Sequence, residues 1–183
     1  MSEQEQDSLT LVSYKSTGFN LQRGEFVCDL LQEIGRESCI LALQEHFIFE
    51  KNLAKIEKLL PNDLIVYSIG SFKDCSNIKR GRGLSFIWHR SFDHIISRIQ
   101  VQKNDRIQCI SVDLPGCKLL LVNVYFPQDS QTRNFDEQEL QRCLASIQHI
   151  LENSQFDQSI ILGDFNCDFT RNSRFVEIVT NFI

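Results

Sequence analysis

The sequence predicts a mixed α/β fold in which helices cover β-sheets. Helical and strand-like segments alternate toward both ends of the chain, whereas the middle is rich in strands, a pattern typical of sheets covered by helices. The chain has 183 residues, of which 42% are hydrophobic and 23% are charged. This size and composition predict one globular domain.

Two strands and two helices are expected in the first third of the chain. Apolar residues at helical spacing indicate the helices, which end at Gly35 and before Pro61, and short apolar runs indicate the strands. The expected order is strand Leu9–Tyr14, helix 23–34, strand Cys39–Leu43 and helix 50–60. Residues 1–8 are expected to be a disordered polar tail before a domain over 9–183.

The rest of the chain is expected to contain mainly strands and then two further helices. The β-rich stretches are 64–68, 84–88, 94–99, 106–113 and 118–125. The tight-turn sequence Asp113-Leu-Pro-Gly116 joins the last two into a predicted hairpin. A helix over 136–152, a strand over 159–162 and a helix over 172–182 complete the prediction.

Charge, hydropathy and cysteine content narrow the class of protein. The net charge of −5 argues against a purely electrostatic nucleic-acid binder. No apolar run approaches the roughly 18 residues that cross a membrane, and the acidic N-terminus is unlike a signal peptide. The seven cysteines are odd in number and contain no C-x-x-C pair. We therefore expect a soluble intracellular protein with free thiols.

Three predicted strands end in polar residues, where side chains emerge from a rigid scaffold. Gln44 and Glu45 follow the buried strand over 39–43, and Tyr125 ends another. Asp164 and Asn166 follow the last strand, two positions apart, so they can face the same side.

The residue types at these strand ends predict phosphate chemistry. Glu45, Asp164 and Asn166 are hard oxygen donors of the kind that Mg²⁺ and Mn²⁺ prefer, and Tyr125 can donate a hydrogen bond to a phosphate. A phosphodiester hydrolase needs a metal ion, an oriented water and a base. Structural roles also fit these residues: a turn at Asp164 and Asn166, packing for Tyr125 and a solvated strand end at Glu45.

Four motifs together resemble the endonuclease/exonuclease/phosphatase superfamily. They are Leu-Gln-Glu at 43–45, Gly-Arg-Gly-Leu-Ser-Phe-Ile at 81–87, Asn-Val-Tyr-Phe-Pro at 123–127 and Leu-Gly-Asp-Phe-Asn at 162–166. Over about 9–180 the chain most resembles the apurinic/apyrimidinic-like endonuclease domains of non-LTR retrotransposons. The resemblance implies a four-layer α/β sandwich of two mixed sheets flanked by helices, and magnesium-dependent nicking of DNA. It also implies a nuclear location and a longer polyprotein with a reverse transcriptase.

The resemblance also implies a role for each residue of the site. Glu45 would bind the Mg²⁺ or Mn²⁺ ion, and Gln44 would support the site beside it. Tyr125 would contact the scissile phosphate, and Asn166 would bind phosphate. Asp164 would orient the attacking water or stabilise the leaving group.

Two departures from the family pattern predict low activity. Lys15 stands where the family has an asparagine. Its ammonium has no acceptor oxygen and repels a metal ion, although it can hold a phosphate. The Ser-Asp-His segment that supplies the family's catalytic histidine does not follow Asn166. We therefore expect a partial domain that lacks its C-terminal strands and is weak or inactive as an enzyme.

The other histidines and one basic loop are open to functional and structural interpretations. Surface or packing roles are expected for His46, His89, His94 and His149. For His46 the reason is that successive strand residues face opposite sides. The loop residues Lys79, Arg80 and Arg82 are expected either to contact a nucleic-acid backbone or to form a solvated hairpin tip.

Two other functions are alternatives to the nuclease. A non-catalytic fragment or pseudoenzyme would bind a partner or a phosphate ligand, with little affinity for Mg²⁺. A small-molecule or lipid phosphoesterase of the same superfamily is the second alternative, but the sequence has neither a substrate-specific insertion nor a membrane segment to indicate it.

Overall fold

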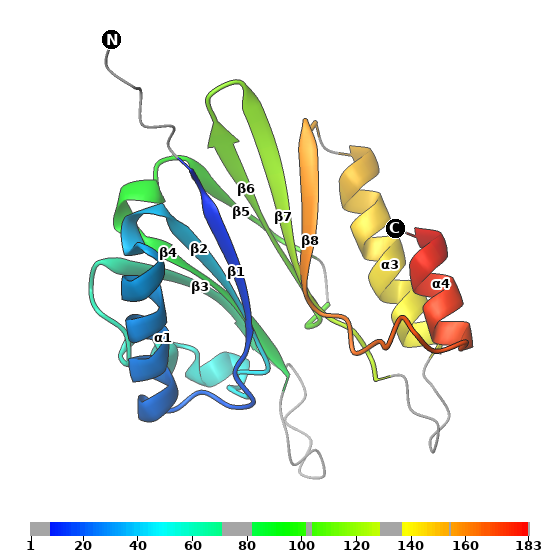
Figure 1. Cartoon of the computed structure of the whole chain (residues 1–183), viewed down its shortest axis with the longest axis horizontal. Coiled ribbons are helices and arrows are strands. Elements are labelled where there is room, and N and C mark those ends of the chain that lie inside the picture. Colours follow the sequence, from blue (N-terminus) through cyan, green and yellow to red (C-terminus); the bar gives the residue numbers. More distant parts are fainter. Residues whose placement is uncertain (1–7, 71–81, 102–103, 129–136, 154, 183) are drawn as a thin grey trace.

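Two four-stranded sheets pack face to face, and helices cover the outer face of each, so the chain has four layers (Figure 1). This computed structural model describes residues 8–70, 82–101, 104–128, 137–153 and 155–182. The predicted α/β sandwich of two mixed sheets flanked by helices is confirmed. The predicted tail lies, except for Ser8, outside the described residues.

The first sheet has the strand order β1-β2-β4-β3. Helix α1 (Leu21–Ile34) connects the two parallel strands β1 and β2, and the other neighbours are antiparallel. The side-chain oxygen of Asn20 caps α1 by accepting the N–H of Arg23 at 3.0 Å, so the helix begins two residues earlier than predicted. The strands are β1 (Thr10–Lys15), β2 (Cys39–Gln44), β3 (Leu64–Gly70) and β4 (Gly83–His89).

The second sheet has the order β5-β6-β7-β8. Its last pair is again parallel, with α3 (Glu137–Asn153) between β7 and β8, and α4 (Arg174–Phe182) packs beside α3. The predicted hairpin is confirmed as β6 and β7, which pair antiparallel around Pro115 and Gly116. The strands are β5 (Ile96–Ile99), β6 (Ile107–Leu114), β7 (Cys117–Tyr125) and β8 (Gln158–Asp164).

Strand β2 shows why the sequence of a buried strand is an unbroken run of apolar residues. Ile40 and Ala42 face the second sheet, whereas Cys39, Leu41 and Leu43 pack under α1. A strand buried on both faces needs apolar residues at every position. Of the six residues of β2, all are buried, and the polar one is Gln44 at the strand's end.

The predicted helix over 50–60 is wrong. The segment forms a 3₁₀ turn (Glu50–Asn52) and then the single-turn helix α2 (Ala54–Glu57). The N–H of Gly70 donates to the Glu50 carboxylate at 2.6 Å, which holds this segment against the end of β3. Ile56 and Leu60 still reach the core, as their spacing predicted.

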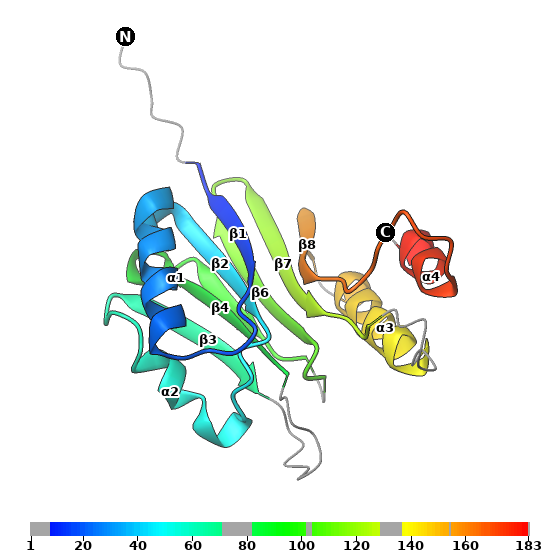
Figure 2. The same ribbon diagram turned by 60° about the horizontal axis from the view of Figure 1, so that its bottom comes forward.

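The two parallel strand pairs belong to different sheets but lie on the same side of the sandwich. Strand β1 contacts β8 across the interface, and both views show their C-terminal ends running the same way (Figures 1 and 2). The carboxyl ends of β1, β2, β7 and β8 therefore meet at one end of the molecule. No described helix is long and apolar enough to cross a membrane.

Candidate functional site

The predicted site residues lie at the end of the sandwich where the parallel strands finish. Lys15 is the last residue of β1, and Glu45 directly follows β2 in the first sheet. Tyr125 and Asp164 are the last residues of β7 and β8, and they pair with each other in the second sheet. Each sheet therefore supplies half of the candidate site.

The backbone around this site is strained. Four described residues other than glycine have positive φ angles: Thr17, Glu45, Phe47 and Asn166. All four lie in the loops that follow β1, β2 and β8. Such conformations cost roughly 1–3 kcal/mol each and persist where surrounding contacts enforce them, often at functional sites. Here one such contact is the hydrogen bond from the Gly18 N–H to the Glu45 carbonyl at 2.7 Å.

Lys15 joins the two carboxylates of the site. Its Nζ lies 2.7 Å from Oδ2 of Asp164 and 3.4 Å from Oε1 of Glu45. The two carboxylate side chains are 16% and 8% exposed, respectively, against 40% for the lysine. Burial alone would lower the pKa of Lys15, but its contacts with Asp164 and Glu45 outweigh this effect and raise the pKa above its usual value. The ammonium is therefore charged across the neutral pH range.

Tyr125 adds a protonated hydroxyl beside these charges. Burial and a hydrogen bond to Glu45 raise the pKa of this phenol well above its ordinary value, so the hydroxyl remains a donor. The centroid of its ring lies 5.3 Å from the Arg106 guanidinium and 6.0 Å from Lys15 Nζ. These two cations border the ring, in an arrangement that favours cation–π attraction.

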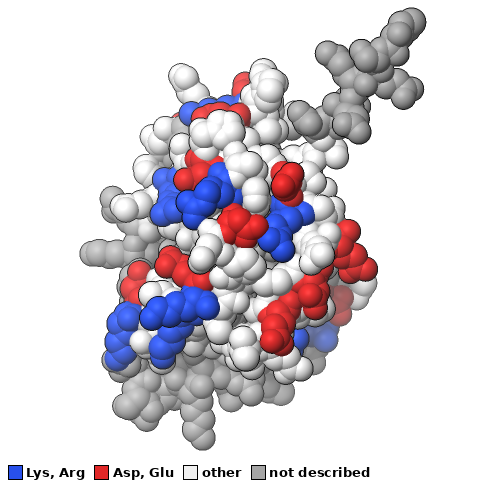
Figure 3. Space-filling model, turned by 90° about the vertical axis from the view of Figure 1, so that its left-hand side faces the viewer, with Lys and Arg blue, Asp and Glu red and all other residues white. Residues whose placement is uncertain are grey.

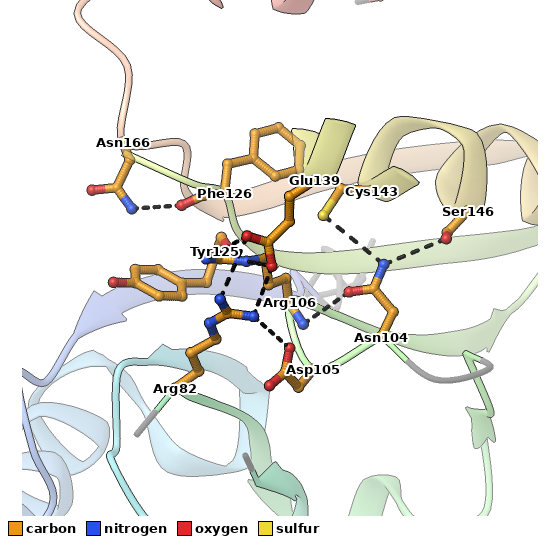
Figure 4. Close-up of polar contacts among 10 residues, drawn as sticks. All are labelled: Arg82, Asn104, Asp105, Arg106, Tyr125, Phe126, Glu139, Cys143, Ser146 and Asn166. Atoms are coloured by element: carbon orange, nitrogen blue, oxygen red, sulfur yellow. Dashed lines mark hydrogen bonds and ion pairs between the residues drawn. The ribbon is translucent and has the colours of Figure 1, made fainter. Parts of the chain in front are cut away.

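Asp164 and Asn166 form a turn and also border the site. Oδ1 of Asp164 accepts the N–H of Asn166 at 3.0 Å, while Oδ2 faces Lys15. The Asn166 side-chain amide donates to the Phe126 carbonyl at 2.8 Å (Figure 4). Asp164 and Asn166 therefore form the turn that their residue types allow. The second carboxylate oxygen of Asp164 still faces the candidate site.

Gln44 links the two sheets beneath the strand ends of the candidate site. It is buried, and its Nε2 donates to Oδ1 of Asn123 on β7 at 2.9 Å. The Asn123 amide donates in turn to the carbonyls of Leu43 and Ser85, both at 3.2 Å. Sequence reasoning missed Asn123, although a buried asparagine inside an apolar strand is a signal for such a role.

A second network missed from the sequence lies behind Tyr125. Arg106 is 8% exposed, and it donates to the Tyr125 carbonyl at 2.9 Å and to Glu139 at 2.8 Å (Figure 4). Arg82 lies 2.8 Å from the same Glu139 and 3.0 Å from Asp105. An arginine that begins an apolar strand is the one sequence signal for this network.

The basic loop is only partly within the described residues. Lys79 and Arg80 lie outside them. Arg82 is engaged in ion pairs with Asp105 and Glu139, so it contributes to internal structure, and its contact with nucleic acid stays a prediction. Among the described residues of the face that carries α1, basic and acidic side chains are interspersed (Figure 3).

His46 has a structural role, for a reason different from strand alternation. Strand β2 ends at Gln44, and Glu45 has a φ of 57°. Nδ1 of His46 accepts the N–H of Ile48 at 3.0 Å, and Nε2 lies 3.1 Å from the Ile69 carbonyl. Burial lowers the pKa of this imidazole to about 4. Both ring nitrogens are engaged, so His46 does not replace a catalytic histidine.

The residues present do not fit a divalent cation. Two carboxylate oxygens, from Glu45 and Asp164, point at one place, as a metal site requires. The Lys15 ammonium occupies that place, and a second cation would meet its charge at close range. In the described part of the chain, no group of three or more His, Cys, Asp or Glu residues is arranged to hold a metal ion.

Comparison with known proteins identifies the fold. No protein-family model matches the sequence, and no curated protein does. Solved structures do match. An endonuclease/exonuclease/phosphatase family protein from Leptotrichia buccalis is 16% identical, with a TM-score of 0.63 over 96% of this chain and 74% of the other. The endonuclease domain of TRAS1, a telomere-specific non-LTR retrotransposon, is 15% identical, with a TM-score of 0.60 over 93% and 69%.

Two structures of TDP2 share the fold as well. That from Caenorhabditis elegans is 22% identical, with a TM-score of 0.56 over 89% of this chain and 49% of the other. That from D. rerio, complexed with a single-strand DNA product, is 17% identical, with a TM-score of 0.57 over 94% and 64%. This chain thus spans about half of the C. elegans structure. It has the endonuclease/exonuclease/phosphatase fold, as the motifs predicted.

Proposed function

We propose that the site receives a phosphodiester of nucleic acid, in a nuclease-type module whose hydrolytic activity is weak or absent. The supporting observation is the convergence of Glu45, Tyr125 and Asp164 from two sheets on one strained end of the fold. The same fold occurs in nucleases and in a DNA-bound structure. Given the net charge of −5, DNA would bind through this site and local basic loops rather than through overall charge.

The side chains provide donors and one acceptor for this role. The second N–H of the Asn166 amide can donate to a phosphate oxygen, and Lys15 has one N–H beyond its two carboxylate contacts. The Tyr125 hydroxyl would donate to phosphate in place of its hydrogen bond to Glu45. Asp164 is the acceptor that would orient a water molecule. Because Lys15 holds Oδ2 of Asp164 and no described histidine contacts it, general base catalysis is weak.

A plasmid-nicking assay run with Mg²⁺, and again with a chelator in its place, tests hydrolysis and the magnesium dependence that the resemblance implies. The variants are Asp164→Ala and, as a matched control on the surface, Asp93→Ala. We expect slow nicking that Asp164→Ala abolishes and Asp93→Ala preserves. Robust nicking in all three proteins would point to a contaminating nuclease, and it would contradict the assignment of the site.

A non-catalytic module is the second candidate, and the Lys15 ion pairs favour it. A lysine that neutralises Asp164 preserves the shape of the site while removing its base. Fluorescence anisotropy with labelled single-strand DNA distinguishes the candidates: binding without nicking, weakened by Tyr125→Phe, supports the module. Absence of both binding and nicking contradicts a nucleic-acid function and leaves the small-molecule phosphoesterase to be tested with phosphate esters.

The wider expectations from the resemblance remain proposals. A nuclear location and a longer polyprotein with a reverse transcriptase would follow if the nuclease belongs to a retrotransposon. The sequence of the transcript beyond the codon for Ile183 tests this directly. An in-frame Ser-Asp-His motif and a reverse transcriptase would support it, and an immediate stop codon would contradict it.

A further inference from the structure

The charges of the site are arranged around one atom, Nζ of Lys15. Oxygens of Glu45 and Asp164 lie 3.4 and 2.7 Å from it, and they come from different sheets. We propose that Lys15 is the resident cation of this site: its ammonium takes the position of a metal ion, so the chain binds no Mg²⁺ or Mn²⁺ there until this charge is removed. The inference rests on the site assigned under the proposed function, but its test involves no nucleic acid.

Burial explains why the site needs a cation. Glu45 is buried, and Oδ2 of Asp164 is buried with the Lys15 ammonium 2.7 Å away. A carboxylate taken out of water is unfavourable unless an opposite charge compensates it. Lys15 provides that charge to both carboxylates.

The fold itself places the Lys15 ammonium in the site, so this cation does not have to bind from solution. Lys15 ends β1, whose register on β2 places it beside Gln44, the residue before Glu45. Gln44 is in turn fixed by its hydrogen bond to Asn123 on the second sheet. The cation is therefore tethered at the junction of both sheets, where a dissociable ion would have to compete with it.

The net charge of the cluster explains why a second cation is excluded. Two carboxylates and one ammonium carry a net charge of −1, and both carboxylate oxygens already face the lysine. A divalent ion within ligand distance of Glu45 would lie close to Nζ and be repelled by it. Removal of the ammonium leaves two convergent carboxylates with the Tyr125 hydroxyl nearby, which are ligands that hard divalent cations prefer.

The inference is tested by titrating the protein with Mn²⁺ or Mg²⁺. Calorimetry measures binding, and thermal unfolding measures any stabilisation. We expect no saturable binding and no stabilisation for the native chain or for Lys55→Asn, a control that removes an exposed positive charge elsewhere. Lys15→Asn should bind one Mn²⁺ at least about tenfold more tightly than the native chain. Its melting temperature should fall without metal and rise with Mn²⁺. The double variant Lys15→Asn/Asp164→Asn should lose this response.

The alternatives give distinct results. Saturable Mn²⁺ binding by the native chain, as tight as that of Lys15→Asn, would overturn the inference. So would a folded Lys15→Asn that takes up no metal. If Lys15→Asn does not fold without metal, Lys15→Gln, which keeps a long side chain, provides the same comparison, and failure of both variants to respond to Mn²⁺ also overturns the inference. A failed nicking assay would not change any of these results.

Discussion

At the scale of single residues, one side chain determines the character of the site. Lys15 makes the two ion pairs that hold Glu45 and Asp164 together across the sheets. An asparagine in that position would offer an oxygen and no charge. The same fold and the same strand ends would then present two uncompensated carboxylates, and the chemistry available there would be different.

Position 83 requires glycine because the His46 ring leaves no room there for a Cβ atom. Gly83 has a φ of 142°, and a Cβ there would overlap the His46 ring. We expect Gly83→Ala to lower the free energy of unfolding by about 3 kcal/mol, through backbone strain and overpacking. Gly116→Ala is the matched control, because its φ is also positive (75°) but nothing lies within 4 Å of the added Cβ. It should cost only about 1 kcal/mol. Urea unfolding of both variants measures the difference, and equal losses would contradict the contact argument.

At the scale of elements, Asn123 connects β7 to β2 and β4. Asn123→Ala leaves the Leu43 and Ser85 carbonyls and the Gln44 amide without this partner in a buried place. We expect a loss of about 3 kcal/mol in the free energy of unfolding. Because Gln44 shares the network, Asn123→Ala and Gln44→Ala should be non-additive, and the double variant should lose clearly less than their sum. Additive losses in urea unfolding would show that the two side chains act independently.

Helix α3 is fastened to the second sheet by Glu139. Burial alone would raise the pKa of Glu139, but its contacts with Arg106 and Arg82 outweigh this and lower it below the usual value. Stability from this ion pair is therefore fully present above pH 4.5 and is lost as the pH falls through the lower folded-state pKa. Glu139→Gln should destabilise the protein by about 2 kcal/mol at pH 7.

The pH dependence of the Glu139→Gln destabilisation distinguishes the loss of this ion pair from a general loss of stability in acid. The difference between the native chain and Glu139→Gln should shrink at strongly acidic pH, where the native carboxyl is also neutral. Glu152→Gln on the exposed face of α3 should show little difference at any pH. Thermal unfolding at pH 7 and in acid checks both. A difference that is independent of pH would contradict the assigned ion pair.

The sequence predicted the elements that local patterns define and missed those that depend on distant contacts. Glu45, Tyr125 and Asp164 were found because each follows an apolar run at a strand end. The prediction of a helix over 50–60 failed because Glu50 binds the end of β3, a contact that hydrophobic periodicity does not reveal. The ion pair from Lys15 to Asp164 depends on β1 and β8 being neighbours across two sheets, a contact that no local pattern predicts.

At the scale of the whole molecule, the charge distribution predicts weak and local binding to DNA. With a net charge of −5 and Arg82 engaged in ion pairs, few phosphates would be neutralised. The plot of log affinity against log salt concentration for single-strand DNA should have a shallow slope, about −1 or −2. Anisotropy titrations at several salt concentrations measure it. A steep slope would indicate an extended basic surface and would contradict a site-directed mode of binding.

The two-sheet construction of the site also has a consequence for the order of folding. Residues 15 and 164 contact each other only after each sheet has formed and the two have docked, and they are separated by most of the chain. Contacts of such long sequence separation form late, because they require large loops to close. We therefore expect Lys15→Asn to accelerate unfolding in stopped-flow measurements while leaving the refolding rate nearly unchanged. The arrangement that defines the site would then be among the last features the chain acquires and among the first it loses.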